Sequence, residues 1–123
     1  MLNVLVVDDE PDVQHLFKQY FRRAIQAGEL GFKFAFSGEE ALAILEQQEA
    51  SVVLVLSDIN MPGMTGLDLL QQIKAHYPTI KVVMITAYGN EDKHQRAMVY
   101  GADGYLTKPI DFDELNESIN RFR

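Results

Sequence analysis

The sequence predicts one α/β domain, a doubly wound parallel sheet of five strands with five helices on both faces. The first observation is that strand-like and helix-like segments alternate along the chain, an order typical of a parallel sheet covered by helices. The second is that several strand-like runs, such as residues 53–56, have no polar face, as expected of strands covered on both sides. The third is the length of 123 residues, which suits a single domain over 1–123.

The first part of the chain predicts two strands joined by a helix. Residues 2–7 form a buried strand. A helix begins at Pro11, whose missing N–H is not needed in a first turn, and apolar residues at helical spacing continue it to Ile25. Gly28 ends that helix. Aromatic residues alternate over 32–36, which predicts a second strand at an edge of the sheet.

The middle of the chain contains two helix starts around the third strand. Ser-Gly-Glu-Glu at 37–40 is a capping box that begins the second helix. The strand at 53–56 runs into Asp58, and the Pro-Gly pair at 62–63 forces a turn. Thr65 then caps the third helix, with an acidic residue three positions on.

The last part predicts two more strand–helix units. Residues 80–85 form the fourth strand. The following helix, from Asn90 to Tyr100, has a thin apolar face, so we expect it to be loosely held. Residues 104–107 form the fifth strand, and a capping box at 111–114 begins the last helix.

Polar side chains follow four of the predicted strands. Asp8 and Asp9 follow the first, Asp58 the third, Thr86 the fourth and Lys108 the fifth. Taken alone, a single aspartate at a strand end is more often a loop acid or a helix cap than a residue that faces a ligand. Because a parallel sheet brings the carboxyl ends of its strands to one edge, where ligands bind, the group as a whole predicts a site.

The predicted site suits a cation and phosphoryl chemistry. At an effective dielectric near 20, two carboxylates about 4 Å apart repel each other by roughly 4 kcal/mol. Mg²⁺ (or Mn²⁺) with oxygen ligands offsets that repulsion, and Lys108 adds a positive charge. A carboxylate in such a setting can attack a phosphoryl group, and Thr86 offers it a hydroxyl. Two alternatives stay open, namely a lysine–aspartate ion pair without metal and a threonine bonded to backbone.

Composition excludes several classes of protein. The net charge of −7 argues against direct binding of nucleic acid, which needs a basic face. The absence of cysteine excludes disulfides and thiolate metal sites. No apolar run reaches the length that spans a membrane, and the N-terminus lacks a signal-peptide pattern. We therefore expect a cytoplasmic protein with no membrane contact.

Four motifs, each at the end of a strand, carry a resemblance to a known family. They are Val-Val-Asp-Asp-Glu-Pro at 6–11, Ser-Asp-Ile-Asn-Met-Pro-Gly-Met-Thr-Gly at 57–66, Ile-Thr-Ala at 85–87 and Gly-Ala-Asp-Gly-Tyr-Leu-Thr-Lys-Pro at 101–109. With these motifs in this order, the chain resembles the receiver domain of two-component response regulators from end to end. The resemblance implies a flavodoxin-like fold with strand order 2-1-3-4-5.

The resemblance also implies roles around the acidic residues. Asp58 would be the phosphoacceptor. Asp9 and Asp58 would bind Mg²⁺ directly, Asn60 through its backbone carbonyl and Asp8 through water. Asn60 and Tyr88 match the variable positions that tune dephosphorylation in the family.

Further roles fall on the fourth and fifth strands. Lys108 would pair with the phosphate and Thr86 would bind a phosphate oxygen. Tyr105 would be the aromatic switch that turns inward behind Thr86. The resemblance implies a cis peptide bond between Lys108 and Pro109, which an X-Pro bond permits at low cost.

The resemblance implies a signalling module and not an enzyme acting on a separate substrate. Asp58 would take a phosphoryl group from a histidine kinase, a histidine phosphotransfer protein or a small acyl phosphate. The segment 90–105 and the last helix would then control a partner, a second copy of the chain or an output domain. The chain contains no effector domain, so it is a stand-alone receiver or part of a longer regulator. Because Met1 suggests the natural start, we expect any output domain to follow Arg123.

Two further functional classes remain to be weighed against a receiver. A haloacid-dehalogenase-type phosphatase also uses an aspartate nucleophile with Mg²⁺, but Asp8-x-Glu10 departs from its Asp-x-Asp pattern and the chain leaves little room for a cap. A flavodoxin-like cofactor binder would need a phosphate loop after the first strand, where this chain has acids. A labelled small phosphodonor distinguishes these functions, because a receiver gains one labile acyl phosphate, a phosphatase turns over and a flavin binder is yellow.

Overall fold

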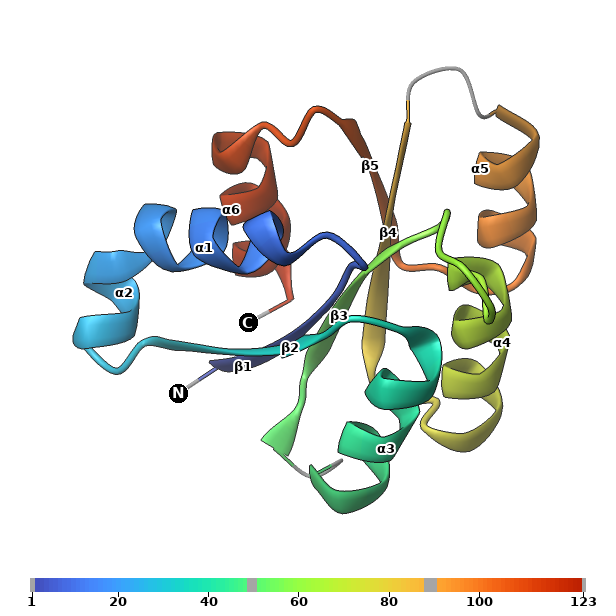
Figure 1. The fold of residues 1–123 in the computed structure, drawn as a ribbon, viewed down its shortest axis with the longest axis horizontal. Coiled ribbons are helices and arrows are strands. Elements are labelled where there is room, and N and C mark those ends of the chain that lie inside the picture. Colours follow the sequence, from blue (N-terminus) through green and yellow to red (C-terminus); the bar gives the residue numbers. More distant parts are fainter. Residues whose placement is uncertain (1, 49–50, 88–90, 123) are drawn as a thin grey trace.

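The computed structural model describes residues 2–48, 51–87 and 91–122, and its centre is a parallel sheet (Figure 1). In the described residues the sheet has five strands in the order β2-β1-β3-β4-β5. They are β1 (Leu2–Val7), β2 (Leu30–Ala35), β3 (Leu54–Asp58), β4 (Lys81–Ala87) and β5 (Gly104–Lys108). The predicted doubly wound α/β fold, the strand order and the edge position of the second strand are confirmed.

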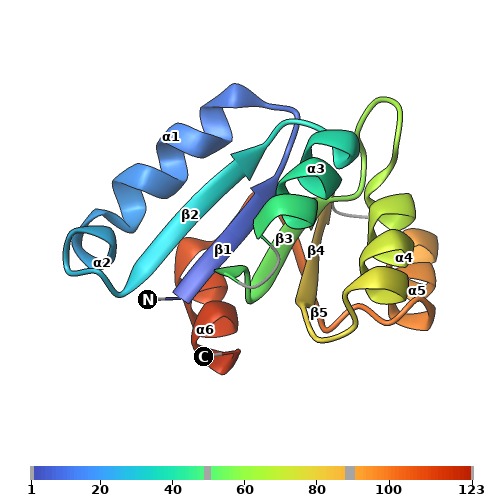
Figure 2. The same cartoon turned by 90° about the horizontal axis from the view of Figure 1, so that it is seen from below.

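Helices cover both faces of this sheet (Figures 1 and 2). One face carries α1 (Pro11–Tyr20), α2 (Arg22–Gln26) and α6 (Phe112–Arg121), and the other carries α3 (Gly38–Gln48), α4 (Gly66–His76) and α5 (Glu91–Val99). Each layer encloses its own apolar core against the sheet. All five residues of β3 are buried, as its continuous apolar run predicts for a central strand.

The prediction of five helices is wrong, because the described residues contain six. The helix expected from Pro11 is interrupted at Phe21, whose backbone leaves the helical region with φ −95° and ψ 16°. Phe21 is buried, and its ring packs 6.1 Å from that of Phe17 and 5.2 Å from that of Phe32. The interruption thus places a large aromatic ring against β2, and Gly28 ends the second segment with a φ of +73°.

The predicted starts of α3, α4 and α6 are confirmed, with differences in their hydrogen bonds. Thr65 and Asp68 form a reciprocal capping box at α4. At α3, Ser37 accepts from the backbone N–H of Glu40, and the Glu40 carboxylate accepts from the N–H of Phe36. Asp111 caps α6 by accepting from two backbone N–H groups.

Helix α5 is held to the sheet by little apolar surface, as predicted. Of the described residues in this helix, Ala97 alone is buried. Met98 and Val99 are 50% and 81% exposed. Tyr100 is partly buried and packs against the core. The predicted helix start at Asn90 lies outside the described residues.

In the part of the chain that the structure describes, no helix has the length and apolar character needed to cross a membrane.

Candidate functional site

Three carboxylates meet where β1 and β3 end. The two strands are neighbours in parallel register, with Val7 opposite Ser57, so the residues that follow emerge side by side. One carboxylate oxygen from each of Asp8, Asp9 and Asp58 lies within 4.8 Å of the others. Asp8 and Asp58 are buried and Asp9 is exposed, so the cluster opens to solvent on one side.

Lys108, at the end of β5, reaches the two buried carboxylates. Its Nζ lies 3.1 Å from Asp58 Oδ2 and 3.4 Å from Asp8 Oδ2. The lysine–aspartate ion pair considered from the sequence is therefore present. It does not account for the whole cluster, because Lys108 pairs with Asp8 and Asp58 while Asp9 belongs to the same cluster.

The surroundings of Asp58 and Lys108 shift their pKa values. Burial raises the pKa of Asp58, and the negative charge of Asp8 raises it further. The hydrogen bonds from Lys108 and from the Asn60 N–H lower this pKa, but the net shift is still upward. Burial lowers the pKa of Lys108, but the two carboxylates outweigh burial and raise it overall. Asp58 is thus an acid that is costly to ionise, beside a lysine that stays charged.

The donor set fits a hard divalent cation. Every ligand atom offered by Asp8, Asp9 and Asp58 is a carboxylate oxygen, the type that Mg²⁺ and Mn²⁺ prefer. Lys108 supplies one positive charge to a cluster of three carboxylates, which leaves negative charge for a cation to offset. The Asn60 N–H donates to Asp58 Oδ1 over 3.2 Å, which holds that segment against the carboxylate.

The loop after Asp58 is fixed by a close approach of two backbones. Gly66, the first residue of α4, donates its N–H to the carbonyl of Ile59 over 2.8 Å. A Cβ added at Gly66 would lie 2.1 Å from the carbonyl oxygen of Asp58. Gly63 makes the turn in this loop with a φ of +73°. The glycines of the motif therefore set the position of the Asp58 backbone.

Thr86 and Tyr105 contact each other on neighbouring strands. Thr86 is fully buried at the end of β4, and a hydrogen bond joins its side chain to that of Tyr105. Burial raises the pKa of Tyr105, and the bond to Thr86 opposes part of the shift. The ring of His94, on α5, stacks on Tyr105 with centroids 3.7 Å apart and planes 10° from parallel. A path of contacts thus runs from Thr86 to α5.

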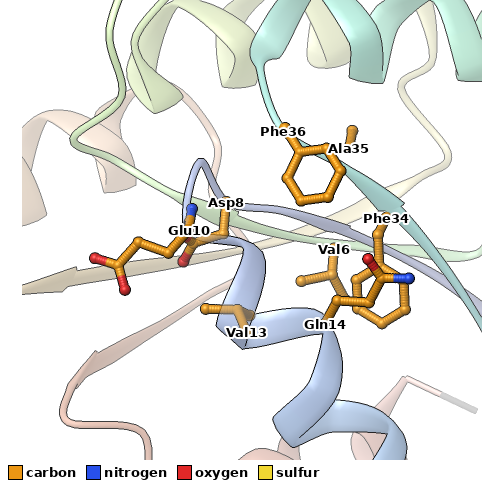
Figure 3. A pocket seen from close by; sticks show the side chains of 8 residues that line it. All are labelled: Val6, Asp8, Glu10, Val13, Gln14, Phe34, Ala35 and Phe36. Atoms are coloured by element: carbon orange, nitrogen blue, oxygen red, sulfur yellow. Dashed lines mark hydrogen bonds between the residues drawn. The ribbon is translucent and has the colours of Figure 1, made fainter.

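A crevice beside Asp8 is apolar, unlike the acidic cluster. It lies between β1, β2 and α1 and is lined largely by apolar side chains, while the carboxylate of Glu10 points away from it (Figure 3). The crevice has no room for a water molecule. It is packing behind the acidic cluster and not a second binding site.

The structure groups Asp8, Asp9, Asp58 and Lys108, and it places Thr86 on the neighbouring strand end in contact with Tyr105. It also adds two residues from a helix. Lys93 donates through its Nζ to the carboxamide oxygen of Asn60, and His94 stacks on Tyr105. Reasoning from strand ends missed both because they lie on α5. The cis peptide bond between Lys108 and Pro109 is confirmed. Tyr88 lies outside the described residues.

Comparison with known proteins decides the family. The family model for the response regulator receiver domain matches residues 4–120. The chain belongs to this family. It is therefore a receiver domain of the two-component response regulators, which work by phosphorylation-dependent signalling.

Two curated relatives and one solved structure illustrate the similarity. Transcriptional regulatory protein MalR of Bacillus subtilis is 35% identical over all of this chain and 51% of its own length. Sporulation initiation phosphotransferase F of Bacillus subtilis is 31% identical over 97% of this chain and 91% of its own. Response regulator TrrA of Thermotoga maritima, solved in complex with Mg²⁺-BeF, is 32% identical over 100% of both chains, with a TM-score of 0.83.

The relatives differ in length from this receiver. The chain spans about half the length of MalR and about a quarter of several other curated regulators that it matches.

Proposed function

We propose that this receiver accepts a phosphoryl group on Asp58 and that the added charge switches the surface formed by α5, β5 and α6. One observation carries the proposal. Asp58 is a buried carboxylate at the end of β3, held 3.1 Å from the Lys108 ammonium and grouped with two further carboxylates. This arrangement combines a nucleophile, a fixed positive charge and a set of cation ligands.

The donor is a phosphohistidine of a histidine kinase or a histidine phosphotransfer protein, or a small acyl phosphate. A carboxylate oxygen of Asp58 attacks phosphorus, a P–O bond forms and the P–N bond to the donor imidazole breaks. The imidazole nitrogen keeps the electron pair and takes a proton. Lys108 lies where its ammonium can pair with the incoming phosphoryl oxygens. The receiver thus catalyses only its own phosphorylation and dephosphorylation.

The acidic cluster holds the cation that this chemistry needs. Asp9 and Asp58 would hold the ion directly, with the backbone carbonyl of Asn60 as a third ligand and Asp8 acting through water, as the resemblance to the family implies. When bound, Mg²⁺ neutralises charge on the phosphoryl oxygens. The Mg²⁺-BeF complex of the related regulator TrrA supports this assignment.

The phosphoryl group acts on the surface through Thr86 and Tyr105. It adds roughly two negative charges and strong acceptor oxygens beside Asp58. The Thr86 hydroxyl turns to this group and gives up its bond to Tyr105. Tyr105 then changes its contact with His94 on α5, a helix with one buried residue among those described. Weakly held elements of this kind are the ones that move.

The surface of α5, β5 and α6 then controls a partner, a second copy of the chain or an output domain. MalR and other relatives are longer than this chain, which supports the last of these. The relative named as a phosphotransferase is of similar length, which supports a role in phosphotransfer between proteins.

The proposal is tested by phosphorylation of wild type and Asp58→Asn. With Mg²⁺ and radiolabelled acetyl phosphate, wild type should gain one phosphoryl group by intact mass, and base or hydroxylamine should release it. Asp58→Asn should gain none, because the amide is not a nucleophile. Asp12→Asn, an exposed acid on α1, is the matched control and should label like wild type. Stoichiometric label on Asp58→Asn would refute the assignment, and continuous turnover would indicate a phosphatase.

We expect Thr86 and Tyr105 to act as one switch. Thr86→Ala and Tyr105→Ala should each accept phosphate at Asp58 and each lose most of the change in hydrogen exchange that beryllofluoride causes over 91–105. The double variant should be no worse than either single variant, because both remove one coupled contact, worth on the order of 1 kcal/mol. Thr107→Ala, exposed on the neighbouring strand opposite Thr86, is the control. Additive losses would show two independent residues.

A further inference from the structure

A lysine side chain ties helix α5 to the phosphoacceptor segment. Lys93 is half-buried, whereas Asp92 and His94 on either side of it are exposed. Its Nζ donates to the side-chain oxygen of Asn60. This contact fixes where the ammonium lies, on a helix that has little apolar contact with the sheet.

Asn60 links this lysine to Asp58. Its backbone N–H donates to Asp58 Oδ1 over 3.2 Å, so both ends of the residue are bonded. The backbone faces the phosphoacceptor and the carboxamide faces α5. Asn60 itself is exposed, so its two bonds are what hold it in place at the mouth of the site.

A cleft beside these residues can hold water. It has a volume of about 250 Å³ and lies between the β3–α4 loop, α4 and α5, lined among others by Asn60, Thr65, Asp68, Lys93 and Arg96. At roughly 30 Å³ for each water molecule, several waters fit in that space. The cleft starts at Ile59 and Asn60, directly after Asp58. Asn60 and Lys93 both line the cleft, and the Asn60 N–H is bonded to Asp58, so the pair lies where the cleft meets the acceptor segment.

We propose that Lys93 is a positioning residue that lengthens the lifetime of the acyl phosphate by holding the Asn60 carboxamide across the approach of water. The inference rests on the proposed function. In hydrolysis, a water oxygen attacks phosphorus, the bond from phosphorus to the Asp58 oxygen breaks, and the water protons stay with the released phosphate and solvent. Without Lys93, the Asn60 side chain turns freely and no longer lies across the approach of water, which favours loss of the phosphoryl group.

The test is the rate of label loss after the phosphodonor is removed. Wild type, Lys93→Ala, Lys93→Arg, Asn60→Ala and the double variant are labelled with acetyl phosphate and Mg²⁺. Lys93→Ala should lose its label about two- to fivefold faster, the size expected for an exposed charged contact. Lys93→Arg keeps the charge and a donor, so it should restore most of the lifetime. Asn60→Ala keeps the backbone carbonyl and should match the double variant, because the pair acts as one unit.

A control variant separates this role from a general effect of charge on α5. Arg96 lines the same cleft from the same helix, so Arg96→Ala removes a cation from the cleft without touching the pair. It should keep the wild-type lifetime, and all variants should keep the wild-type melting temperature within about 2 °C.

Three outcomes would overturn the inference. They are an unchanged or longer lifetime in Lys93→Ala, an equal acceleration in Arg96→Ala, and additive effects of Lys93→Ala and Asn60→Ala. The proposed function fails in a different way, because wild type would then gain no label at all. Equal lifetimes in labelled proteins would contradict the role of Lys93 alone and leave Asp58 as the acceptor.

Discussion

Gly66→Ala should destabilise the receiver by more than about 3 kcal/mol and displace Asp58. The added Cβ would lie 2.1 Å from the Asp58 carbonyl oxygen, 2.6 Å from Ile59 Cα and 2.8 Å from the Asp58 carbonyl carbon. These are backbone atoms in and directly after a central strand, so the strand and α4 have to separate. A steric conflict that a packed core cannot relieve falls in the largest class of single-residue effects. Thermal unfolding followed by circular dichroism measures the loss.

Gly38→Ala is the matched control for this prediction. Gly38 is the first residue of α3, as Gly66 is of α4. A Cβ at Gly38 would meet the Sδ of Met64 at 2.7 Å, which is the far end of a flexible side chain and can move. We expect Gly38→Ala to change stability by less than about 1 kcal/mol. A loss of similar size in both variants would show that the close approach of Gly66 to Asp58 is not what matters.

The sequence predicted the sheet and its site because both follow from strand patterns. The run at 53–56 marks a central strand, and its end at Asp58 belongs to the edge where the other strand ends meet. Parallel pairing alone therefore brings Asp8 and Lys108 to the same place, as the structure shows.

The features that the sequence did not predict depend on side chains from different elements. The break at Phe21 follows from aromatic packing against β2, and no proline or glycine marks it. The contacts of Lys93 and His94 depend on the rotation of α5 relative to the sheet. Helical periodicity gives little information on that rotation when the apolar face is as thin as this one.

Asp58→Asn should stabilise the receiver at neutral pH in the absence of Mg²⁺, although it removes the phosphoacceptor. Burial and Asp8 raise the pKa of Asp58 above its ordinary value of 3.8, so the unfolded chain releases this proton more readily than the folded one. Ionisation therefore favours unfolding, and stability is lost as the pH rises through the raised pKa. Asparagine has no charge to bury. We expect a gain of about 1 kcal/mol, or about 4 °C in Tm.

The pH dependence provides the check on the cause. Below the ordinary carboxyl value of 3.8, Asp58 is protonated in both states, so wild type and Asp58→Asn should converge in stability. The gain should grow as the pH rises from there to 7. Lys108 keeps Asp8 as a partner at 3.4 Å in the variant, which limits the loss of pairing. Glu46→Gln, an exposed residue of α3, is the control and should change little across the whole range.

Mg²⁺ should stabilise the receiver, because it offsets the repulsion among the carboxylates of Asp8, Asp9 and Asp58. At ten times its Kd, a ligand that binds the native state alone raises stability by about 1.4 kcal/mol. Wild type should therefore gain in Tm with millimolar Mg²⁺, while Asp58→Asn should gain much less, because the variant has lost a ligand and the charge that the ion offsets. Asp9→Ala separates the two causes. Asp9 is exposed, so its removal should leave the metal-free stability near that of wild type and still abolish most of the gain from Mg²⁺. An equal rise in Tm in all three proteins would show that the ion binds elsewhere.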